Sequence, residues 1–327
     1  MKKNKFDLAL KVGAKKLHLN RKKLISEGEK YRKKYQDKKG YIKRKFLKYR
    51  NCPICKRKND EFLFYKNGGK YVKCKNCELI YLNPCFGDTH LENYYKGMHS
   101  MQSATIKNES EFYVKIYSYG LESINKFVKK KNKKILDIGC SNGLFLDIAK
   151  KNSWETFGIE LNKKEYLISQ KNHRVENTSV LNLNKAFNNK FDTICMWDVI
   201  EHVKDTNNLL KIIKRSLNKG GLFFFQTPNV NSLAARIMHE KSNVFDGIEH
   251  TNLFNDKNVN IIAKKNKFKL IKIESVISEI PIISNYLDYL DPYYGGSRKK
   301  NILGMINEKQ MHENYLGYKM QVILKSI

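Results

Sequence analysis

Blocks of apolar and polar positions alternate along the second half of the chain. Apolar runs at 135–138, 156–160, 191–197 and 222–227 have the length of buried strands. Between these runs, apolar residues recur at helical spacing, at about 144–151, from 163 and at 207–217. The alternation continues with a helix near 255–266, a strand at 269–276 and a last strand near 318–324. Strands that alternate with helices predict an α/β fold with a doubly wound, mostly parallel sheet.

A different pattern precedes this block. Two short alternating runs, at 62–65 and 70–73, flank the turn sequence Asn67-Gly68-Gly69 and predict a β-hairpin. The hairpin lies between the pairs Cys52-x-x-Cys55 and Cys74-x-x-Cys77 and brings them to the same end.

The chain therefore divides by composition into four parts. Residues 1–50 form a basic helical extension, 51–84 a small cysteine-bearing ribbon, 85–130 a connector with a helix near 109–130, and 131–327 the main α/β domain. We expect a loop-rich insertion in the main domain at about 278–315, and insertions of this kind often cover a binding site.

The net charge of +31 is extreme. A basic surface points to phosphates in nucleic acid, in nucleotide-activated substrates or on an anionic membrane, although the abundance of Lys, Asn and Ile also fits an AT-rich genome. Residues 1–50 hold 20 of the 63 Lys and Arg residues but 4 of the 32 acidic ones. This extension is either a solvated helical tail or a contact for an anionic surface or partner.

Hydropathy bears on location. No run of 18 apolar residues exists, so we expect no membrane-spanning helix. Charged residues interrupt the N-terminal segment where a signal peptide needs an apolar centre, so we expect a cytoplasmic protein.

The two cysteine pairs are separated by 18 residues. In a reducing compartment this spacing is typical of a tetrahedral zinc site with Cys52, Cys55, Cys74 and Cys77 as ligands. Four protein ligands leave no open position, so the zinc would be structural. Redox-active or unligated thiols are the alternatives.

The first strand of the main domain ends in the turn Asp137-Ile138-Gly139-Cys140-Ser141-Asn142-Gly143. Glycine lets the backbone approach a ligand closely, and Asp137 can orient the turn or accept a hydrogen bond from a cofactor amine. The spacing differs from the Gly-x-Gly-x-x-Gly of dinucleotide sites. Glu160 follows the second strand, where a carboxylate can bind both hydroxyls of a ribose.

Four blocks, ILDIGCSNG at 135–143, GIE at 158–160, FDTICMWDVIEHV at 191–203 and GGLF at 220–223, occur in order. They resemble the class I S-adenosylmethionine-dependent methyltransferases, which have a Rossmann-like fold. The resemblance implies S-adenosylmethionine (SAM) as cofactor, with its methionine part on Gly139, Cys140, Ser141, Asn142 and Gly143 and its ribose on Glu160. It further implies adenine near Asn182 and Leu183. Trp197 and Asp198 can line the cofactor or acceptor pocket, although Trp197 fits equally well as a packing residue.

The bridge after the second cysteine pair, Glu78-Leu79-Ile80-Tyr81-Leu82-Asn83-Pro84, resembles that of bacterial methyltransferases that carry a zinc ribbon. Many of these modify sugars or small molecules in surface-glycan and natural-product pathways. Methyl transfer requires a base only when a hydroxyl or an acidic carbon attacks. His202 and His250 have suitable side chains. His202 either acts as that base or only orients its loop, and His250 is the second candidate for the base.

The leading hypothesis is therefore a methyltransferase acting on a small acceptor, a sugar or nucleotide sugar. The main alternative is a zinc-ribbon RNA methyltransferase whose ribbon and basic extension bind the phosphates of the RNA. A non-catalytic binding module and a nicotinamide-dependent enzyme are the remaining alternatives.

Overall fold

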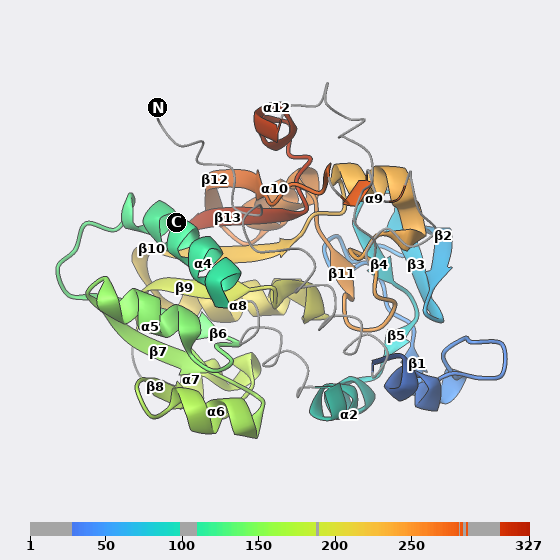
Figure 1. Ribbon diagram of the computed structural model, residues 1–327, viewed down its shortest axis with the longest axis horizontal. Helices are drawn as coiled ribbons and strands as arrows, with labels where there is room; N and C mark the ends of the chain where they lie inside the picture. The colour runs from blue at the N-terminus through green and yellow to red at the C-terminus, as the bar shows by residue number, and fades with distance from the viewer. Residues whose placement is uncertain (1–27, 99–109, 188–189, 281, 284–285, 287–307) are drawn as a thin grey trace. The chain divides into compact units, whose positions relative to one another are not determined.

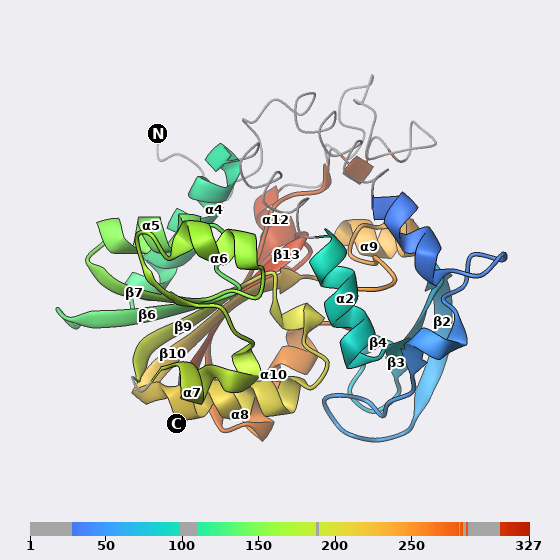
Figure 2. The same ribbon diagram turned by 90° about the horizontal axis from the view of Figure 1, so that it is seen from below.

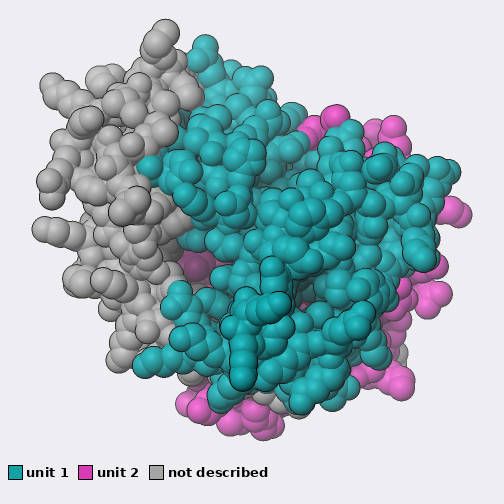
Figure 3. Space-filling model, turned by 90° about the vertical axis from the view of Figure 1, so that its right-hand side faces the viewer, with its two compact units in different colours: residues 1–112, 228–255, 274–320 teal, residues 113–227, 256–273, 321–327 magenta. Residues whose placement is uncertain are grey.

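The computed structural model describes residues 28–98, 110–187, 190–280, 282–283, 286 and 308–327. Most of the basic extension and of the expected insertion at 278–315 lies outside these residues. The chain divides into two compact units, coloured separately in Figure 3. The first unit holds residues 1–112, 228–255 and 274–320, and the second holds 113–227, 256–273 and 321–327.

A seven-stranded sheet forms the centre of the second unit (Figure 1). Its order is β12-β13-β10-β9-β6-β7-β8, and the pairs β10–β9, β9–β6, β6–β7 and β7–β8 are parallel. The strands are β6 (Lys133–Ile138), β7 (Trp154–Ile159), β8 (Arg174–Glu176), β9 (Phe191–Trp197), β10 (Leu217–Pro228), β12 (Phe268–Val276) and β13 (Lys319–Ser326). The doubly wound, mostly parallel sheet expected from the sequence is confirmed.

Helices cover both faces of this sheet (Figure 2). One face carries α4 (Ser110–Asn125), α5 (Leu144–Lys151) and α6 (Lys163–Ser169); the other carries α7 (Leu183–Ala186), α8 (Thr206–Ser216) and α10 (Asp256–Lys265). Side chains cap two of the helices at their N-termini: Asn162 accepts from two backbone N–H groups of α6, and Asp205 from one of α8. Phe223, Phe224 and Phe225 on β10 are all fully buried, as expected for a strand covered on both faces.

The first unit contains a four-stranded sheet in the order β11-β4-β3-β2. Strands β2 (Asp60–Lys66) and β3 (Gly69–Cys74) form the antiparallel hairpin predicted from the sequence. Strand β4 (Ile80–Leu82) pairs with β3, and β11 (Asn252–Leu253), from a distant part of the chain, pairs with β4. The cysteine-bearing hairpin is therefore completed by a segment that follows β10.

Short elements complete the described part of the chain. In the first unit these are η1 (Lys33–Tyr35), η2 (Arg44–Phe46), β1 (Leu47–Lys48), β5 (Cys85–Phe86), α2 (Asp88–Met98), α9 (Leu233–Met238), η5 (His239–Lys241) and α12 (Glu308–Glu313), and in the second η3 (Val180–Asn182) and η4 (Ile200–His202). Tyr31, Tyr35 and Phe46 pack against buried Phe86 and Tyr94, so the end of the basic extension joins a core. Among the described residues, no helix combines the length and apolarity needed to cross a bilayer.

Gly120 on α4 provides a test of packing in the second unit. Alanine is favoured over glycine within a helix by about 1 kcal/mol. A Cβ at Gly120, however, would lie 2.4 Å from Cη2 of Trp197 and 2.9 Å from Cζ of Phe224. We therefore expect Gly120→Ala to lower the free energy of unfolding by about 1–3 kcal/mol, because overpacking outweighs the helix preference.

Urea denaturation measures this change. Ser118→Ala, on the same helix but only partly buried, is the matched control and is expected to change stability by about 0.5 kcal/mol or less. A Gly120→Ala protein as stable as the wild type would show that Trp197 and Phe224 do not pack as described.

Candidate functional site

The turn after β6 has an unusual backbone. Gly139, Ser141 and Gly143 all have positive φ, at 79°, 48° and 89°. A Cβ at Gly139 would lie 2.7 Å from Cγ2 of Val199, so the protein's own packing and the positive φ both favour glycine here. Gly143 then caps the N-terminus of α5.

Glu160 lies directly after β7 and is held by the turn. Its Oε2 accepts from the backbone N–H of Ser141 at 2.8 Å, and its Oε1 accepts from that of Asn162 at 2.7 Å. Burial raises the pKa of Glu160, while these two N–H groups oppose the shift by stabilising the carboxylate. Both oxygens are therefore fixed at the carboxyl edge of the sheet.

Asp137, in β6, is 2% exposed, and its Oδ1 has no hydrogen-bond partner among the described residues. Burial, and secondly the Glu160 carboxylate, hold the pKa of Asp137 well above its usual range. A buried acceptor without a partner is costly, and a cationic donor would relieve the cost. SAM carries an ammonium and a sulfonium, so this acidic pair fits it, whereas a pyrophosphate would be repelled.

The side chains of the other residues of the turn contact the protein itself, which leaves mainly their backbone groups for a ligand. The Cys140 side chain is buried, with its Sγ 3.9 Å from Oγ of Ser169, so it points into the protein core. Oδ1 of Asn142 accepts from the backbone N–H of Leu144 at the start of α5. Ser141 donates its hydroxyl to Glu165, which sequence reasoning missed.

The residues expected near adenine lie where η3 meets α7: Asn182 ends η3 and Leu183 begins α7. Asn182 is exposed and its Nδ2 donates to Oγ1 of Thr178, whereas Leu183 is 1% exposed. The neighbouring Leu181 is 60% exposed. The adenine assignment to Asn182 and Leu183 stays a prediction.

Trp197 ends β9 inside an aromatic cluster. Its ring centroid lies 4.6 Å from those of Tyr117 and Phe224 and 5.0 Å from that of Phe145. Its buried Nε1 has no hydrogen-bond partner among the described residues. Tyr117, on α4, was missed in the sequence because its helix precedes the recognisable blocks.

Asp198 follows β9 with a positive φ of 55°, and its Oδ2 accepts from Nε2 of Gln226 at 3.1 Å. His202 ends the short turn η4, and its side chain is 22% exposed. Its Nε2 lies 4.0 Å from Oε1 of the fully buried Glu201, whose Oε2 accepts from the Thr227 hydroxyl. This arrangement suits either proposed role of His202, base or loop anchor.

His250 belongs to the first unit. Its Nδ1 lies 2.8 Å from the carbonyl oxygen of Val244. Because a carbonyl only accepts, the neutral ring carries its hydrogen at Nδ1 and leaves Nε2 as the basic nitrogen. Desolvation, and secondly the Asp246 carboxylate, raise the pKa of the adjacent Glu249 to about 7.

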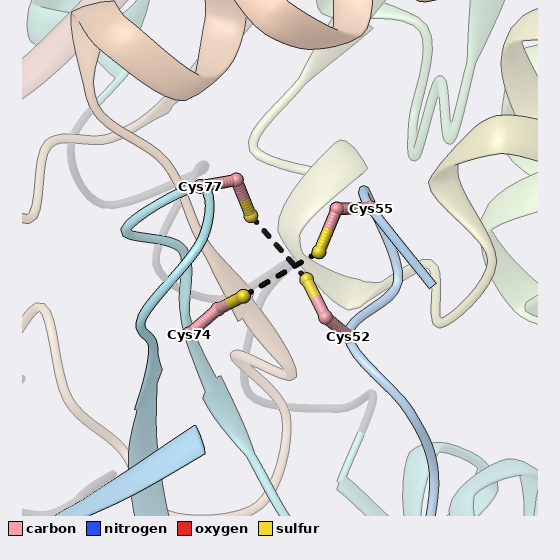
Figure 4. Close-up of side chains that lie close together, drawn as sticks. All are labelled: Cys52, Cys55, Cys74 and Cys77. Atoms are coloured by element: carbon pink, nitrogen blue, oxygen red, sulfur yellow. Dashed lines mark hydrogen bonds between the residues drawn. The ribbon is translucent and has the colours of Figure 1, made fainter. Parts of the chain in front are cut away.

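The four cysteines of the ribbon converge (Figure 4). Their sulfur atoms all lie within 4.8 Å of one another, and those of Cys52 and Cys77 are 3.4 Å apart and those of Cys55 and Cys74 3.5 Å apart. Tetrahedral zinc with Zn–S bonds of about 2.3 Å requires sulfurs roughly 3.8 Å apart, so the cluster fits the ion. All four are free of disulfides.

The two cysteine pairs have the same local backbone. Lys56 and Glu78 follow the first cysteine of each pair by four positions, have positive φ, and donate their N–H to that cysteine's carbonyl. The Cys77 thiol, and secondly burial, raise the pKa of Cys52, and burial raises the pKa of Cys74. The backbone N–H groups of Ile54 and Cys55 oppose the shift at Cys52, and those of Asn76 and Cys77 oppose it at Cys74. Such N–H groups stabilise a metal-bound thiolate.

Residues 115–273 match the profile of a family described as "Methyltransferase domain". These residues form a methyltransferase domain. This match, the strand order of the sheet and the solved structures described below confirm the expected class I SAM-dependent methyltransferase fold, and the cysteine cluster suits a small zinc site.

Relatives share this domain. The chain is 27% identical over 122 residues to ubiquinone biosynthesis O-methyltransferase of Chromobacterium violaceum, covering 35% of this chain and 52% of the relative. It is 28% identical over 144 residues to tRNA U34 carboxymethyltransferase of Campylobacter fetus, covering 42% and 49%. The chain thus spans about half the length of the curated relatives it matches.

Solved structures share the fold. Magnesium protoporphyrin IX methyltransferase from Synechocystis, with bound S-adenosylhomocysteine, superimposes with a TM-score of 0.50 at 10% identity, covering 74% of this chain and all of that one. The plantazolicin methyltransferase superimposes with a TM-score of 0.50 at 12% identity, covering 72% and 94%. Neither similarity identifies an acceptor for this chain.

Asp137 provides a pH test in the absence of cofactor. Because the pKa of Asp137 is raised on folding, its protonated form favours the folded state, and stability falls as pH rises from its unfolded value towards the folded one. Asparagine does not ionise. We expect the stability of Asp137→Asn relative to wild type to increase by roughly 1–3 kcal/mol between pH 4 and pH 8.

Urea denaturation across this pH range measures the difference. Glu155→Gln, an exposed carboxylate on neighbouring β7, is the control and should show no comparable rise. A pH-independent difference for Asp137→Asn would contradict a buried, destabilised carboxylate at this position.

Proposed function

We propose that this protein transfers the methyl group of SAM to a small-molecule acceptor, a sugar or nucleotide sugar, in a glycan or natural-product pathway. The cofactor half of the proposal depends on one observation. Buried Asp137 and backbone-bound Glu160 end adjacent parallel strands beside a turn with three positive φ values. This arrangement provides backbone groups and acidic oxygens for a cationic nucleoside.

The roles of the residues follow from their chemistry. The backbone of Gly139 to Gly143 would hold the methionine part, with Asp137 accepting from its ammonium. Glu160 would accept from the ribose hydroxyls, Asn182 and Leu183 would border the adenine, and Trp197 and Asp198 would line the pocket. When bound, SAM supplies an electrophilic methyl group, so the protein has to orient an acceptor atom in line with the sulfonium.

A hydroxyl acceptor also needs a base. We propose His250 for this role because its neutral ring presents a basic Nε2, and we propose that His202 orients its own loop beside buried Glu201. The name of the ubiquinone biosynthesis relatives supports an oxygen acceptor. The four-cysteine ribbon and its bridge, which resemble those of sugar-modifying bacterial enzymes, support a sugar.

An RNA acceptor is the second candidate. The net charge of +31 and the similarity to a tRNA U34 carboxymethyltransferase favour it. In that case the basic extension at 1–50 would contact phosphates. With a small acceptor it would instead be a solvated tail or contact an anionic surface.

Calorimetry with S-adenosylhomocysteine tests the cofactor site. Glu160→Ala should weaken binding at least about tenfold, because loss of a charged hydrogen bond costs roughly 1.5–3 kcal/mol. Glu155→Ala, which removes an exposed carboxylate from the same strand, should bind like the wild type. Equal affinity for all three proteins would refute the assignment of Glu160.

A transfer assay tests the acceptor. Methyl-labelled SAM should label a member of a nucleotide-sugar panel, and His250→Gln should lose this activity while retaining S-adenosylhomocysteine affinity. Labelling of RNA instead, with affinity that falls steeply with salt, would replace the small-molecule proposal with the second candidate.

We also propose that Cys52, Cys55, Cys74 and Cys77 bind one structural zinc ion. Cys74→Ser should reduce the bound zinc from about one per chain and lower the melting temperature, because metal binding contributes to folding free energy. Cys195→Ser, at a buried cysteine within β9, should retain the metal. Elemental analysis measures the zinc content of the wild type and of each variant. Wild-type protein with intact thiols but no zinc would refute the proposed metal site.

A further inference from the structure

The ribbon sheet contacts a distant segment of the first unit, residues 244–253, which we call the His250 loop. Strand β11 at the end of this loop pairs with β4, and the N–H of Leu82 donates to the carbonyl of Thr251. Nη2 of Arg50 donates to that same carbonyl and, at 2.9 Å, to Oδ1 of Asn252. The end of the loop is therefore fixed to the ribbon by main-chain and side-chain bonds.

Tyr71 on β3 binds the middle of the same loop. Its side chain is fully buried. Its hydroxyl donates to the carbonyl oxygen of His250 and accepts from the N–H of Gly247, both at 3.2 Å. One hydroxyl thus satisfies two backbone groups on either side of the turn that leads to His250.

Backbone approaches backbone where this turn meets the hairpin. A Cβ at Gly69 would lie 1.9 Å from the carbonyl oxygen of Gly247, and Gly247 has a φ of 88°. Phe245 packs beside this contact, with its ring 4.8 Å from that of Phe64 and 5.2 Å from that of Tyr71. The hairpin is therefore shaped to receive this loop.

The loop in turn fixes the His250 ring. The Asp246 carboxylate accepts from the backbone N–H groups of Ile248, Glu249 and His250, which closes the turn. Nδ1 of His250 contacts the Val244 carbonyl at 2.8 Å. Any displacement of the His250 backbone relative to Val244 would break this contact and release the tautomer.

We propose that Tyr71 is a positioning residue for His250, and that holding the His250 loop is the role of the ribbon in methyl transfer. This inference rests on the proposed function of His250 as the base. The Tyr71 hydroxyl fixes the His250 backbone, the loop fixes Nδ1 on Val244, and Nε2 is kept basic and aimed in one direction. The ribbon thereby acts on the reaction through the His250 ring.

Tyr71→Phe tests the inference, because it keeps the buried ring and removes only the hydroxyl. We expect amide hydrogen exchange across 246–252 to accelerate about tenfold, since two backbone groups lose their partner. In ¹⁵N spectra of the imidazoles, assigned with His250→Gln, the His250 signal should move from the Nδ1–H tautomer towards a mixture. Affinity for S-adenosylhomocysteine should stay within twofold.

Controls separate positioning from general damage. Tyr65→Phe removes an exposed hydroxyl from the same hairpin and should change none of these readouts. Arg50→Lys, which loses the bonds to Thr251 and Asn252, should loosen the same loop and covers the case in which Tyr71→Phe does not fold. Zinc content should be unchanged in each variant.

An unaltered His250 tautomer and unaltered loop exchange in both Tyr71→Phe and Arg50→Lys would overturn the inference. A wild-type protein that binds no S-adenosylhomocysteine would refute the proposed function instead, and the His250 spectra would still decide whether Tyr71 positions the ring.

Discussion

The parallel pairing of β6 with β7 and β9 is the constraint on which the second unit depends. Parallel strands bring their carboxyl ends to one edge, so Asp137, Glu160 and Asp198 gather there although they are distant in sequence. The glycine turn links the first two, because the Ser141 N–H binds the Glu160 carboxylate. A cationic cofactor suits this edge because the buried oxygens of Asp137 and Glu160 would accept from its charged groups.

The sheet of the first unit depends on other interactions. This sheet is small, and it is stabilised by a four-cysteine cluster at one end and by packing on residues 244–253 at the other. Small sheets bury little apolar area, so such additional contacts contribute a large share of their stability. The backbone of Gly69 in the hairpin lies so close to that of Gly247 in the His250 loop that a side chain at Gly69 would not fit between them.

Long, buried elements could be predicted from the sequence. The helix at 144–151 and the strand at 191–197 have the bounds expected, because each is long enough to show its periodicity. Strands β4, β8 and β11 have only two or three residues, and no periodicity can identify them. Their pairing depends on tertiary contacts, so β11 was not predicted.

The candidate site shows the same limit. Glu160 was predicted from its place after a strand, and the structure adds its two backbone donors. Glu165 could have been recognised from Asn162, three positions earlier, whose side chain caps α6. Two features could not be predicted from the sequence: the lack of a hydrogen-bond partner for Oδ1 of Asp137 among the described residues, and the Tyr71 bonds to the His250 loop. Both depend on which atoms lie nearby after folding. The assignments of Asn182, Leu183, His202 and His250 stay predictions.

The pairing of β4 with β11 also orders events during synthesis. Tyr71 and His250 lie 179 positions apart, so the hairpin leaves the ribosome long before its last strand exists. Until β10 and the following residues have been made, β4 is an open edge that exposes Ile80 and Leu82. The four cysteines lie within 26 residues of one another, so they can bind a metal before β11 has been synthesised. A bound metal would then hold the hairpin in register until β11 pairs with β4. Pairing β11 with β4 closes a long loop, and the entropy cost of that closure grows with the logarithm of the loop length.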